Sequence, residues 1–307
     1  MGLLVEGQWQ ANEIIATNGH FKRKSSGFRH WITADGSSDF KAEPNRYHLY
    51  ISLACPWASR TLIFRKLKKL EDIISLSVVD PLMLENGWTF SENVDCIPDS
   101  VNSKTYLHEI YSLADPHYTG RVTVPVLWDK KTYTIVNNES ADIIRIFNSE
   151  FSAFAEETPD YYPDTLRKDI DKMNDFVYAN INNGVYKCGF ATTQSAYDAA
   201  YDELFSALEF LENHLSKQTY LVGNQITEAD WRLFTTLIRF DAVYYSLYKC
   251  NKERLSDYEF LHEYLLRLFE VPGIADTVNM DHIKRHYYMS QTQLNPNRIV
   301  PKGPETI

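Results

Sequence analysis

The sequence has few cysteines, no long apolar run and no excess of positive charge, and each absence excludes a class of protein. Its four cysteines form no CxxC pair, no zinc-ligand spacing and no disulfide framework. A reducing compartment fits this usage, so we expect a cytoplasmic protein. No apolar run approaches the roughly 20 residues that span a membrane. The first ten residues also lack the basic and apolar regions of a secretory signal.

The charge balance is acidic, with 31 basic and 41 acidic side chains and a formal net charge of −10. A nucleic-acid-binding protein would need a basic face. The most basic run, residues 64–69, we interpret as the solvated side of a helix, so no nucleic-acid partner is expected. The chain has 307 residues and is 44% hydrophobic, which indicates about two domains, each with its own core.

The first half of the chain alternates strand and helix patterns. The predicted elements are a strand at 46–54, a helix at 56–70, a strand at 73–79, an irregular segment at 80–120, a hairpin at 122–129 and 132–137, and a helix at 139–148. A strand, a helix and a strand in this order predict a parallel pair with a crossover helix. A segment as long as 80–120 inside a domain is often functional.

Strand patterns stop after the linker-like stretch 149–164, and the segments that follow have helical periodicity. The second domain is therefore predicted to be all-helical. The predicted division of the chain is an N-terminal arm packed on the next domain (1–45), an α/β domain (46–150), a helical domain (163–290) and a C-terminal tail (291–307).

Cys55 lies at the start of the predicted helix 56–70, directly before Pro56. Proline is favoured at the first helical position because its missing N–H would have no intrahelical partner there. The N-terminus of a helix carries partial positive charge and free N–H groups, and both favour a thiolate over a thiol. A buried, inert cysteine is the alternative. Residue 58 is an alanine, so Cys55 would have to form its mixed disulfide with an external thiol.

Pro125 interrupts the strand-like run 122–129, although a proline cannot donate to a strand ladder. One interpretation places this run at a sheet edge. The other is a cis peptide bond between Val124 and Pro125, which would present the backbone of Val124 to a ligand. The proline alone leaves both open, whereas the element order and the Cys-Pro helix start favour the cis bond.

Several longer segments occur together in a characteristic order. They are ACPWASRTLI, PLMLENGWTF, GRVTVPVLWD and NNESADIIRIFN in the first half, with NNGVYKCGFATTQ and RHYYMS in the second. On these segments, from about Trp31 to the C-terminus, the chain closely resembles the Xi class of glutathione transferases, the glutathionyl-hydroquinone reductases. The resemblance implies an α/β thioredoxin-fold N-terminal domain followed by an all-α C-terminal domain. One departure is Ser59, where many members have a histidine; we do not expect it to touch the chemistry.

The resemblance implies glutathione as co-substrate and Cys55 as the catalytic nucleophile. The residues expected to bind glutathione are Trp88, Arg121, Val124, Pro125, Glu139 and Ser140. Val124 would pair with the cysteinyl backbone by strand addition. The N-terminus of helix 139–148 would bind the γ-glutamyl carboxylate, and Glu139 the α-ammonium. A plain helix cap is the alternative role for Glu139 and Ser140, and it is compatible with binding.

The acceptor side is expected to be aromatic. Tyr186 and Tyr288, with Tyr287 as a third member, match family tyrosines that line the quinol pocket, and their hydroxyls would bind the quinol oxygens. Most of the 20 tyrosines should nevertheless be packing residues. His282 and His286 have an i, i+4 spacing that suits a metal. No third ligand accompanies them, so we expect no metal and place both at the helix surface or the pocket edge.

The reaction implied by the resemblance is reduction of S-glutathionyl-hydroquinones to hydroquinones, through a mixed disulfide on Cys55 and with release of oxidised glutathione. A homodimer is also expected. A broader thiol transferase or dehydroascorbate reductase, like the omega class, would use the same cysteine without a quinol pocket. A non-catalytic ligand-binding module would tolerate loss of the thiol.

Overall fold

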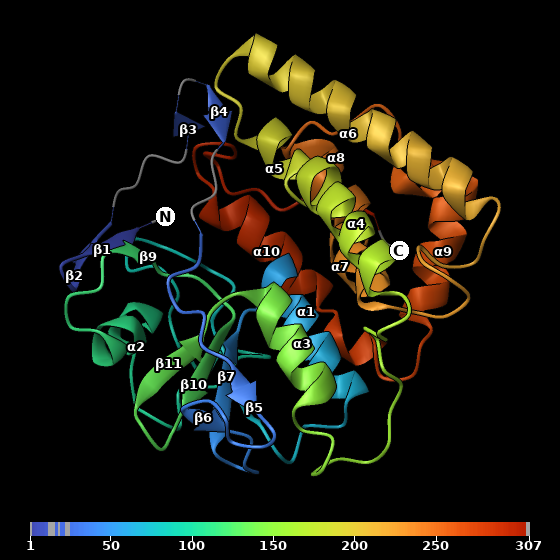
Figure 1. The fold of residues 1–307 in the computed structure, drawn as a ribbon. Coiled ribbons are helices and arrows are strands. Elements are labelled where there is room, and N and C mark those ends of the chain that lie inside the picture. The colour runs from blue at the N-terminus through green and yellow to red at the C-terminus, as the bar shows by residue number, and fades with distance from the viewer. Residues whose placement is uncertain (1, 12–15, 18, 22–24, 305–307) are drawn as a thin grey trace. The chain divides into compact units, whose positions relative to one another are not determined.

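The computed structural model describes residues 2–11, 16–17, 19–21 and 25–304, which fall into two units (Figure 1). The first unit takes the described residues within 1–13, 25–159 and 276–286. The second takes those within 14–24, 160–275 and 287–307. Parts of the predicted arm and tail, namely residues 1, 12–15, 18, 22–24 and 305–307, lie outside the described residues.

A four-stranded sheet organises the first unit, in the order β11-β10-β7-β8. Its strands are β7 (Tyr47–Ile51), β8 (Ser75–Val78), β10 (Val126–Asp129) and β11 (Thr134–Asn137). Strand β7 is parallel to β8, while β10 is antiparallel to both β7 and β11. The predicted parallel pair and hairpin are therefore confirmed. All five residues of β7 are buried, as expected for a central strand covered on both faces.

Two helices pack together beside this sheet (Figure 1): α1 (Pro56–Leu67), which connects β7 to β8, and α3 (Ser140–Ser149). Helix α1 is shorter than predicted because Lys69 adopts a left-handed conformation with φ +52°. The interpretation of 64–69 as a solvated face is wrong for two of its cations. Lys68 is buried and donates to the carbonyl of Pro159 at 2.9 Å, and Arg65 donates to the carbonyl of Ile74 at 2.7 Å.

The segment 80–120 contains a helix that the sequence patterns did not predict, α2 (Leu107–Ala114). Its buried residues Leu107, Ile110 and Tyr111 follow helical spacing. The carboxylate of Glu109 accepts a hydrogen bond from the N–H of Tyr106 at 2.8 Å and so caps the helix.

Short strands cover much of the N-terminal region. In the first unit, β1 (Leu3–Val5) pairs antiparallel with β2 (Gln8–Gln10) and with β9 (Gly120–Arg121), and β5 (Ile32–Thr33) is parallel to β6 (Phe40–Lys41). In the second unit, β3 (Ala16–Thr17) pairs with β4 (His20–Phe21). The predicted arm thus contains strands that are too short for sequence patterns to detect.

The second unit is built mainly from helices. They are α4 (Arg167–Val177), η1 (Tyr178–Asn182), α5 (Gly184–Gly189), α6 (Gln194–Leu215), α7 (Glu228–Leu237), η2 (Phe240–Tyr244), α8 (Tyr245–Leu247), η3 (Leu255–Asp257) and α9 (Glu259–Phe269). The 3₁₀ turn η4 (Ala275–Thr277) and α10 (Met280–Ser290) are each divided between the units. The α/β-plus-helical fold class is confirmed. Within the described chain, no helix is long and apolar enough to cross a membrane.

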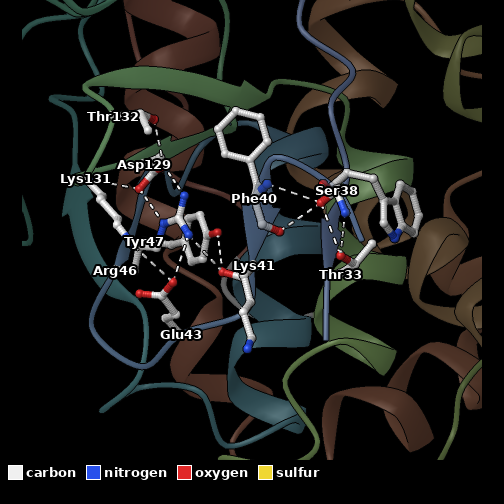
Figure 2. Close-up of polar contacts among 11 residues, drawn as sticks. Thr33, Ser38, Phe40, Lys41, Glu43, Arg46, Tyr47, Asp129, Lys131 and Thr132 are labelled. Atoms are coloured by element: carbon white, nitrogen blue, oxygen red, sulfur yellow. Dashed lines mark hydrogen bonds and ion pairs between the residues drawn. The ribbon is translucent and has the colours of Figure 1, made fainter. Parts of the chain in front are cut away.

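A buried ion pair lies at the amino end of β7 (Figure 2). Arg46, the residue before the strand, makes two hydrogen bonds to the carboxylate of Asp129, at 2.9 and 2.7 Å. The carboxylate also accepts from the hydroxyl of Thr132 at 2.7 Å and from the N–H of Lys131 at 2.9 Å. The remaining guanidinium nitrogen donates to Glu43 at 3.1 Å. Both charges are therefore hydrogen-bonded on several sides, which buried ions require.

Candidate active site

Cys55 lies beyond the other, carboxyl end of β7, at the N-cap of α1. Its backbone is extended (φ −78°, ψ 121°), and Pro56 occupies the start of the helix. The side chain is partly exposed. Ser59 donates both its N–H and its hydroxyl to the carbonyl of Cys55, at 2.9 and 3.0 Å. The predicted position of the cysteine at a helix start is confirmed, and the hydroxyl of Ser59 is engaged with the backbone.

The peptide bond between Val124 and Pro125 is cis, as predicted. Strand β10 begins one residue later, so the proline precedes the ladder instead of interrupting it. The thiol of Cys55 faces the carbonyl oxygen of Val124, with an Sγ–O distance of 3.8 Å. The structure therefore brings together the sulfur and the backbone that were expected to hold a bound thiol peptide.

The N-terminus of α3 carries the two residues expected at the γ-glutamyl end of glutathione. Glu139 is the N-cap, and its Oε1 accepts from the N–H of Ala141 at 3.1 Å and from the hydroxyl of Ser140 at 3.5 Å. Its Oε2 accepts from the hydroxyl of Ser26 at 3.0 Å. The helix-cap role is therefore correct, and it holds the carboxylate in a fixed orientation at a helix N-terminus, where anions are favoured.

Trp88 and Arg121 occupy separate segments of the first unit. Trp88 is buried, and its indole stacks on the imidazole of His286 with ring centroids 4.8 Å apart. The Nδ1 of His286 donates to the carbonyl of Pro81 at 2.9 Å. Arg121 is partly exposed and belongs to β9, where its backbone pairs with Leu3. The support of Trp88 by a histidine was not predicted from the sequence.

Of the two placements predicted for His282 and His286, the helix surface is wrong because both side chains are buried, while the pocket edge stays a prediction. His282 is 1% exposed and His286 is 8% exposed. The Nε2 of His282 donates to the carbonyl of Val94 at 3.1 Å, so both imidazoles bind the backbone of the long segment after β8. Among the residues that the structure describes, no group of three histidine, cysteine or acidic side chains could hold a metal ion.

The predicted acceptor tyrosines lie in the second unit, and one of them differs from the others. The hydroxyls of Tyr186 and Tyr287 are 2.6 Å apart, and that of Tyr287 is 3.0 Å from the hydroxyl of Tyr244. Tyr288 instead donates to the carbonyl of Ala242 at 3.1 Å. Tyr186 is partly exposed, whereas Tyr244 and Tyr287 are buried, and burial raises the pKa of each of these two well above its usual value.

Sequence reasoning missed Tyr244, and no signal in the chain could have singled it out among 20 tyrosines. It lies at the end of the π-helical turn η2, which places its hydroxyl on Tyr287. Three linked hydroxyls, of which one belongs to a partly exposed side chain, can donate hydrogen bonds to oxygen atoms of a ligand. The first unit offers a thiol, a strand backbone and a helix N-terminus. The chemistry available is therefore thiol exchange with a short peptide.

Comparison with protein families gives two matches, one in each unit. Residues 54–150 match the model of the glutathione S-transferase N-terminal domain, and residues 194–267 match that of the C-terminal domain. The first match begins at Ala54, directly before the N-cap cysteine, and it includes Val124, Pro125 and the start of α3.

Individual relatives match this chain over nearly its whole length. The glutathionyl-hydroquinone reductase YqjG of Escherichia coli K12 is 53% identical, with 99% of this chain and 95% of that protein covered. PcpF of Sphingobium chlorophenolicum, also a glutathionyl-hydroquinone reductase, is 49% identical, with 99% and 96% covered. Two solved structures superpose closely. The glutathione-bound structure of YqjG has a TM-score of 0.92 at 51% identity, with 100% of this chain and 96% of that chain covered. The Xi-class transferase of Natrialba magadii has a TM-score of 0.95 at 48% identity, with 100% and 94% covered. The chain therefore belongs to the glutathione transferase family and, within it, to the Xi class that includes the glutathionyl-hydroquinone reductases.

Proposed function

We propose that this protein reduces S-glutathionyl-hydroquinones to hydroquinones, with glutathione as the reductant. The observation that carries the proposal is the partly exposed Cys55 at the N-cap of α1, with its Sγ 3.8 Å from the carbonyl that precedes cis-Pro125. A cysteine here forms a disulfide with glutathione, whereas a conjugating transferase would need a hydroxyl to activate glutathione's own thiol. The likeness to YqjG and PcpF supports the choice of substrate.

Glutathione binds to the first unit in this proposal. Its cysteinyl backbone pairs with Val124, and its γ-glutamyl carboxylate lies at the N-terminus of α3, near the N–H and hydroxyl of Ser140. The α-ammonium pairs with Glu139. Trp88 packs against the peptide, and Arg121 pairs with its glycyl carboxylate. In this proposal the glutathione-binding domain comprises residues 46–150 and the helical domain residues 163–290.

The chemistry balances in two exchanges. The Cys55 thiolate attacks the sulfur of the thioether, so that a disulfide forms and the aryl carbon–sulfur bond breaks. The electron pair of that bond stays on the ring carbon, which takes up one proton, and the hydroquinone leaves. A second glutathione, as thiolate, attacks the mixed disulfide, releasing oxidised glutathione and the Cys55 thiolate.

The tyrosine hydroxyls supply hydrogen bonds to the quinol. Tyr186 is the partly exposed member of the linked set, so its hydroxyl donates a hydrogen bond to a quinol oxygen and stabilises negative charge there, while the proton of the step goes to the ring carbon. Tyr287 holds the hydroxyl of Tyr186, and Tyr244 holds that of Tyr287. Tyr288, whose hydroxyl donates to the carbonyl of Ala242, also lines the quinol side in this proposal, outside the linked set.

The test is turnover of glutathionyl-menadiol with glutathione, compared with turnover of a small glutathione mixed disulfide and of dehydroascorbate. Wild-type protein should cleave the quinol thioether. Tyr186→Phe should lose about 10- to 100-fold on this substrate and keep its rate on the small disulfide, because only the quinol uses the hydroxyl. Tyr162→Phe serves as a control, because Tyr162 bonds the exposed Asp171 instead of the linked set.

Two outcomes would contradict the proposal. If the wild type turns over the small disulfide or dehydroascorbate but not glutathionyl-menadiol, the protein is a general thiol transferase. If it turns over none of them, it is a binding module.

The proposal extends to the state of the enzyme in the cell. It is a homodimer, works in the cytoplasm and needs no metal, and neither nucleic acid nor membrane is a partner. The cysteine usage of the chain, four residues with no CxxC pair, fits a reducing compartment. Sedimentation equilibrium measures the subunit number, and full activity after dialysis against a chelator is the expected result for the metal.

A further inference from the structure

The N-terminal segments of the chain contact three of the places assigned to glutathione. Strand β1 pairs with β9, with Leu3 opposite Arg121. The indole Nε1 of Trp9 donates to the carbonyl of Glu85 at 2.9 Å. Its ring lies over Gly87, the neighbour of Trp88, where an added Cβ would be only 2.9 Å from the ring. Ser26 bonds Glu139. These segments therefore contact the residue proposed for the glycyl carboxylate, the neighbour of the proposed tryptophan and the residue proposed for the α-ammonium.

Residues 26–30 are fixed along the junction of β11 and α3. Phe28 and Asn138 exchange two hydrogen bonds, each 3.1 Å long, through the side-chain oxygen and the backbone N–H of Asn138. His30 donates its N–H to the carbonyl of Val136 at 3.0 Å. Arg29 makes an ion pair with Asp142 in the first turn of α3. This set of contacts holds the hydroxyl of Ser26 within hydrogen-bonding distance of the carboxylate of Glu139.

The two oxygens of Glu139 are oriented by different parts of the chain. The N–H of Ala141 in α3 binds Oε1, whereas the hydroxyl of Ser26 from the N-terminal segment binds Oε2. A carboxylate can accept about four hydrogen bonds; the hydroxyl of Ser140 also binds Oε1, so the remaining acceptor capacity for a ligand cation lies on Oε2. Without the second donor the carboxylate could rotate about its last torsion, which has a broad, shallow preference.

We propose that Ser26 is a positioning residue that orients the carboxylate of Glu139 toward the α-ammonium of glutathione, so that the N-terminal segment completes the γ-glutamyl end of the site. This inference rests on the proposed function, because Glu139 must be the partner of the ammonium. Its consequence is selective. Removing the hydroxyl of Ser26 weakens ligands that carry the ammonium and leaves ligands without it unaffected.

The experiment uses two ligands and isothermal titration calorimetry on the full chain. One ligand is S-methylglutathione. The other is S-methyl-glutaryl-cysteinyl-glycine, which has the same length and carboxylates but no ammonium. Wild-type protein should bind the first more tightly. Ser26→Ala should weaken the first about fivefold, as expected for partial loss of a charge-assisted interaction, and leave the second unchanged.

Three controls make the result specific. Ser26→Thr keeps a hydroxyl and should restore the wild-type preference. Ser25→Ala removes the neighbouring, exposed serine and should change neither affinity. Equal melting temperatures of wild type and Ser26→Ala exclude unfolding. In steady state, Ser26→Ala should raise KM for glutathionyl-menadiol, whose glutathionyl part occupies this site, and leave kcat unchanged.

Contrary results separate this inference from the proposed function. If the wild type fails to bind S-methylglutathione, the glutathione site itself is wrong, and the role of Ser26 is wrong with it. If the wild type binds but Ser26→Ala keeps full affinity, or weakens both ligands equally, the positioning role alone is overturned. Loss of preference in Ser26→Thr would overturn it as well.

Discussion

At its amino end, β7 begins after Arg46, whose guanidinium meets a fully buried carboxylate; at its carboxyl end, it leads to a partly exposed cysteine. Strand β10 runs the opposite way, with Val126 beside Tyr50 and Asp129 beside Tyr47. Its end therefore supplies the partner of Arg46, while its start follows the carbonyl that faces the thiol. The same two strands thus build both regions.

The two regions differ in how completely their polar groups are paired. At the amino end, Asp129 accepts hydrogen bonds from Arg46, Thr132 and the backbone of Lys131, so the region is closed (Figure 2). At the carboxyl end, the sulfur faces a carbonyl at a long 3.8 Å and keeps some exposure. Ligands of open α/β sheets bind near the carboxyl ends of parallel strands, and β7 follows this rule. The closed end should therefore control stability and the open end activity.

The largest effect should come from Cys55→Ser at the open end, which should remove activity and leave stability unchanged. The rate on glutathionyl-menadiol should fall by at least about a thousandfold, because a serine hydroxyl cannot form a disulfide and does not ionise at neutral pH. The melting temperature should stay within about 2 °C, since the change is small in volume. Steady-state kinetics and calorimetry measure the two effects. Cleavage at the wild-type rate would show that another group is the nucleophile.

Asp129→Ala, at the closed end, should lower stability and leave activity unchanged. It leaves the buried guanidinium of Arg46 without its principal partner, so the free energy of unfolding of the first unit should fall by about 3–5 kcal/mol. Urea titration measures this loss, and kcat per folded molecule should be unchanged. Glu71→Ala is the control, since its ion pair with Lys66 at 3.1 Å is solvent-exposed and should cost less than about 1 kcal/mol. Equal costs for the two variants would contradict the contrast.

The sequence could predict the open end but not the closed one. The Cys-Pro helix start and the proline before β10 are local patterns, so Cys55, Pro56 and Pro125 could be recognised within a few residues. Arg46 and Asp129 are 83 residues apart, and no local pattern joins them. Strands of two or three residues, such as β1 and β9, are similarly set by pairing partners that are distant in sequence.

Helix rotation explains why the sequence could not distinguish the tyrosines of the acceptor side from one another. Tyr287 and Tyr288 are consecutive, so their side chains leave α10 about 100° apart. The sequence shows that a tyrosine is present but not which of the two faces Tyr186; the 2.6 Å contact identifies Tyr287. The same uncertainty left open whether His282 and His286 lie at the helix surface or at the pocket edge, and the structure buries both. Helix α2 was missed because its N-cap is Tyr106, an unusual capping residue.

Acid should lower the free energy of unfolding because of His48, the second residue of β7, near the closed end. Burial lowers the pKa of its imidazole to about 4, from 6.5 in an unfolded chain. Its nitrogens bond the hydroxyls of Ser75 at 2.7 Å and Ser77 at 2.9 Å. Above pH 6.5 both states are neutral and this stability is complete. As the pH falls from 6.5 toward 4, only the unfolded state takes up the proton, so the folded state loses about 3 kcal/mol between pH 7 and pH 4.

Urea titrations over this pH range measure the loss, with His48→Gln as the control. The variant should be less sensitive to pH by that amount, because glutamine does not titrate. Parallel pH dependences of wild type and variant would contradict a neutral buried imidazole.

The smallest expected effect is a lowered pKa of Cys55 at the open end. It tests whether the carbonyl of Val124 or the N-terminus of α1 controls the ionisation of the thiol. Two influences oppose each other: donation of the S–H to the carbonyl of Val124 favours the thiol, while the N-terminus of α1 favours the thiolate. A sulfur–oxygen distance of 3.8 Å marks a weak hydrogen bond, so we expect the helix to dominate and the pKa of Cys55 to lie below the free value of about 8.5. Absorbance at 240 nm against pH, as the difference between wild type and Cys55→Ala, reports this thiol alone. Cys250 supplies an internal contrast, because burial raises its pKa well above the usual value and it should stay protonated throughout. A difference midpoint at or above 8.5 would mean that the carbonyl dominates and that the resting site favours the thiol.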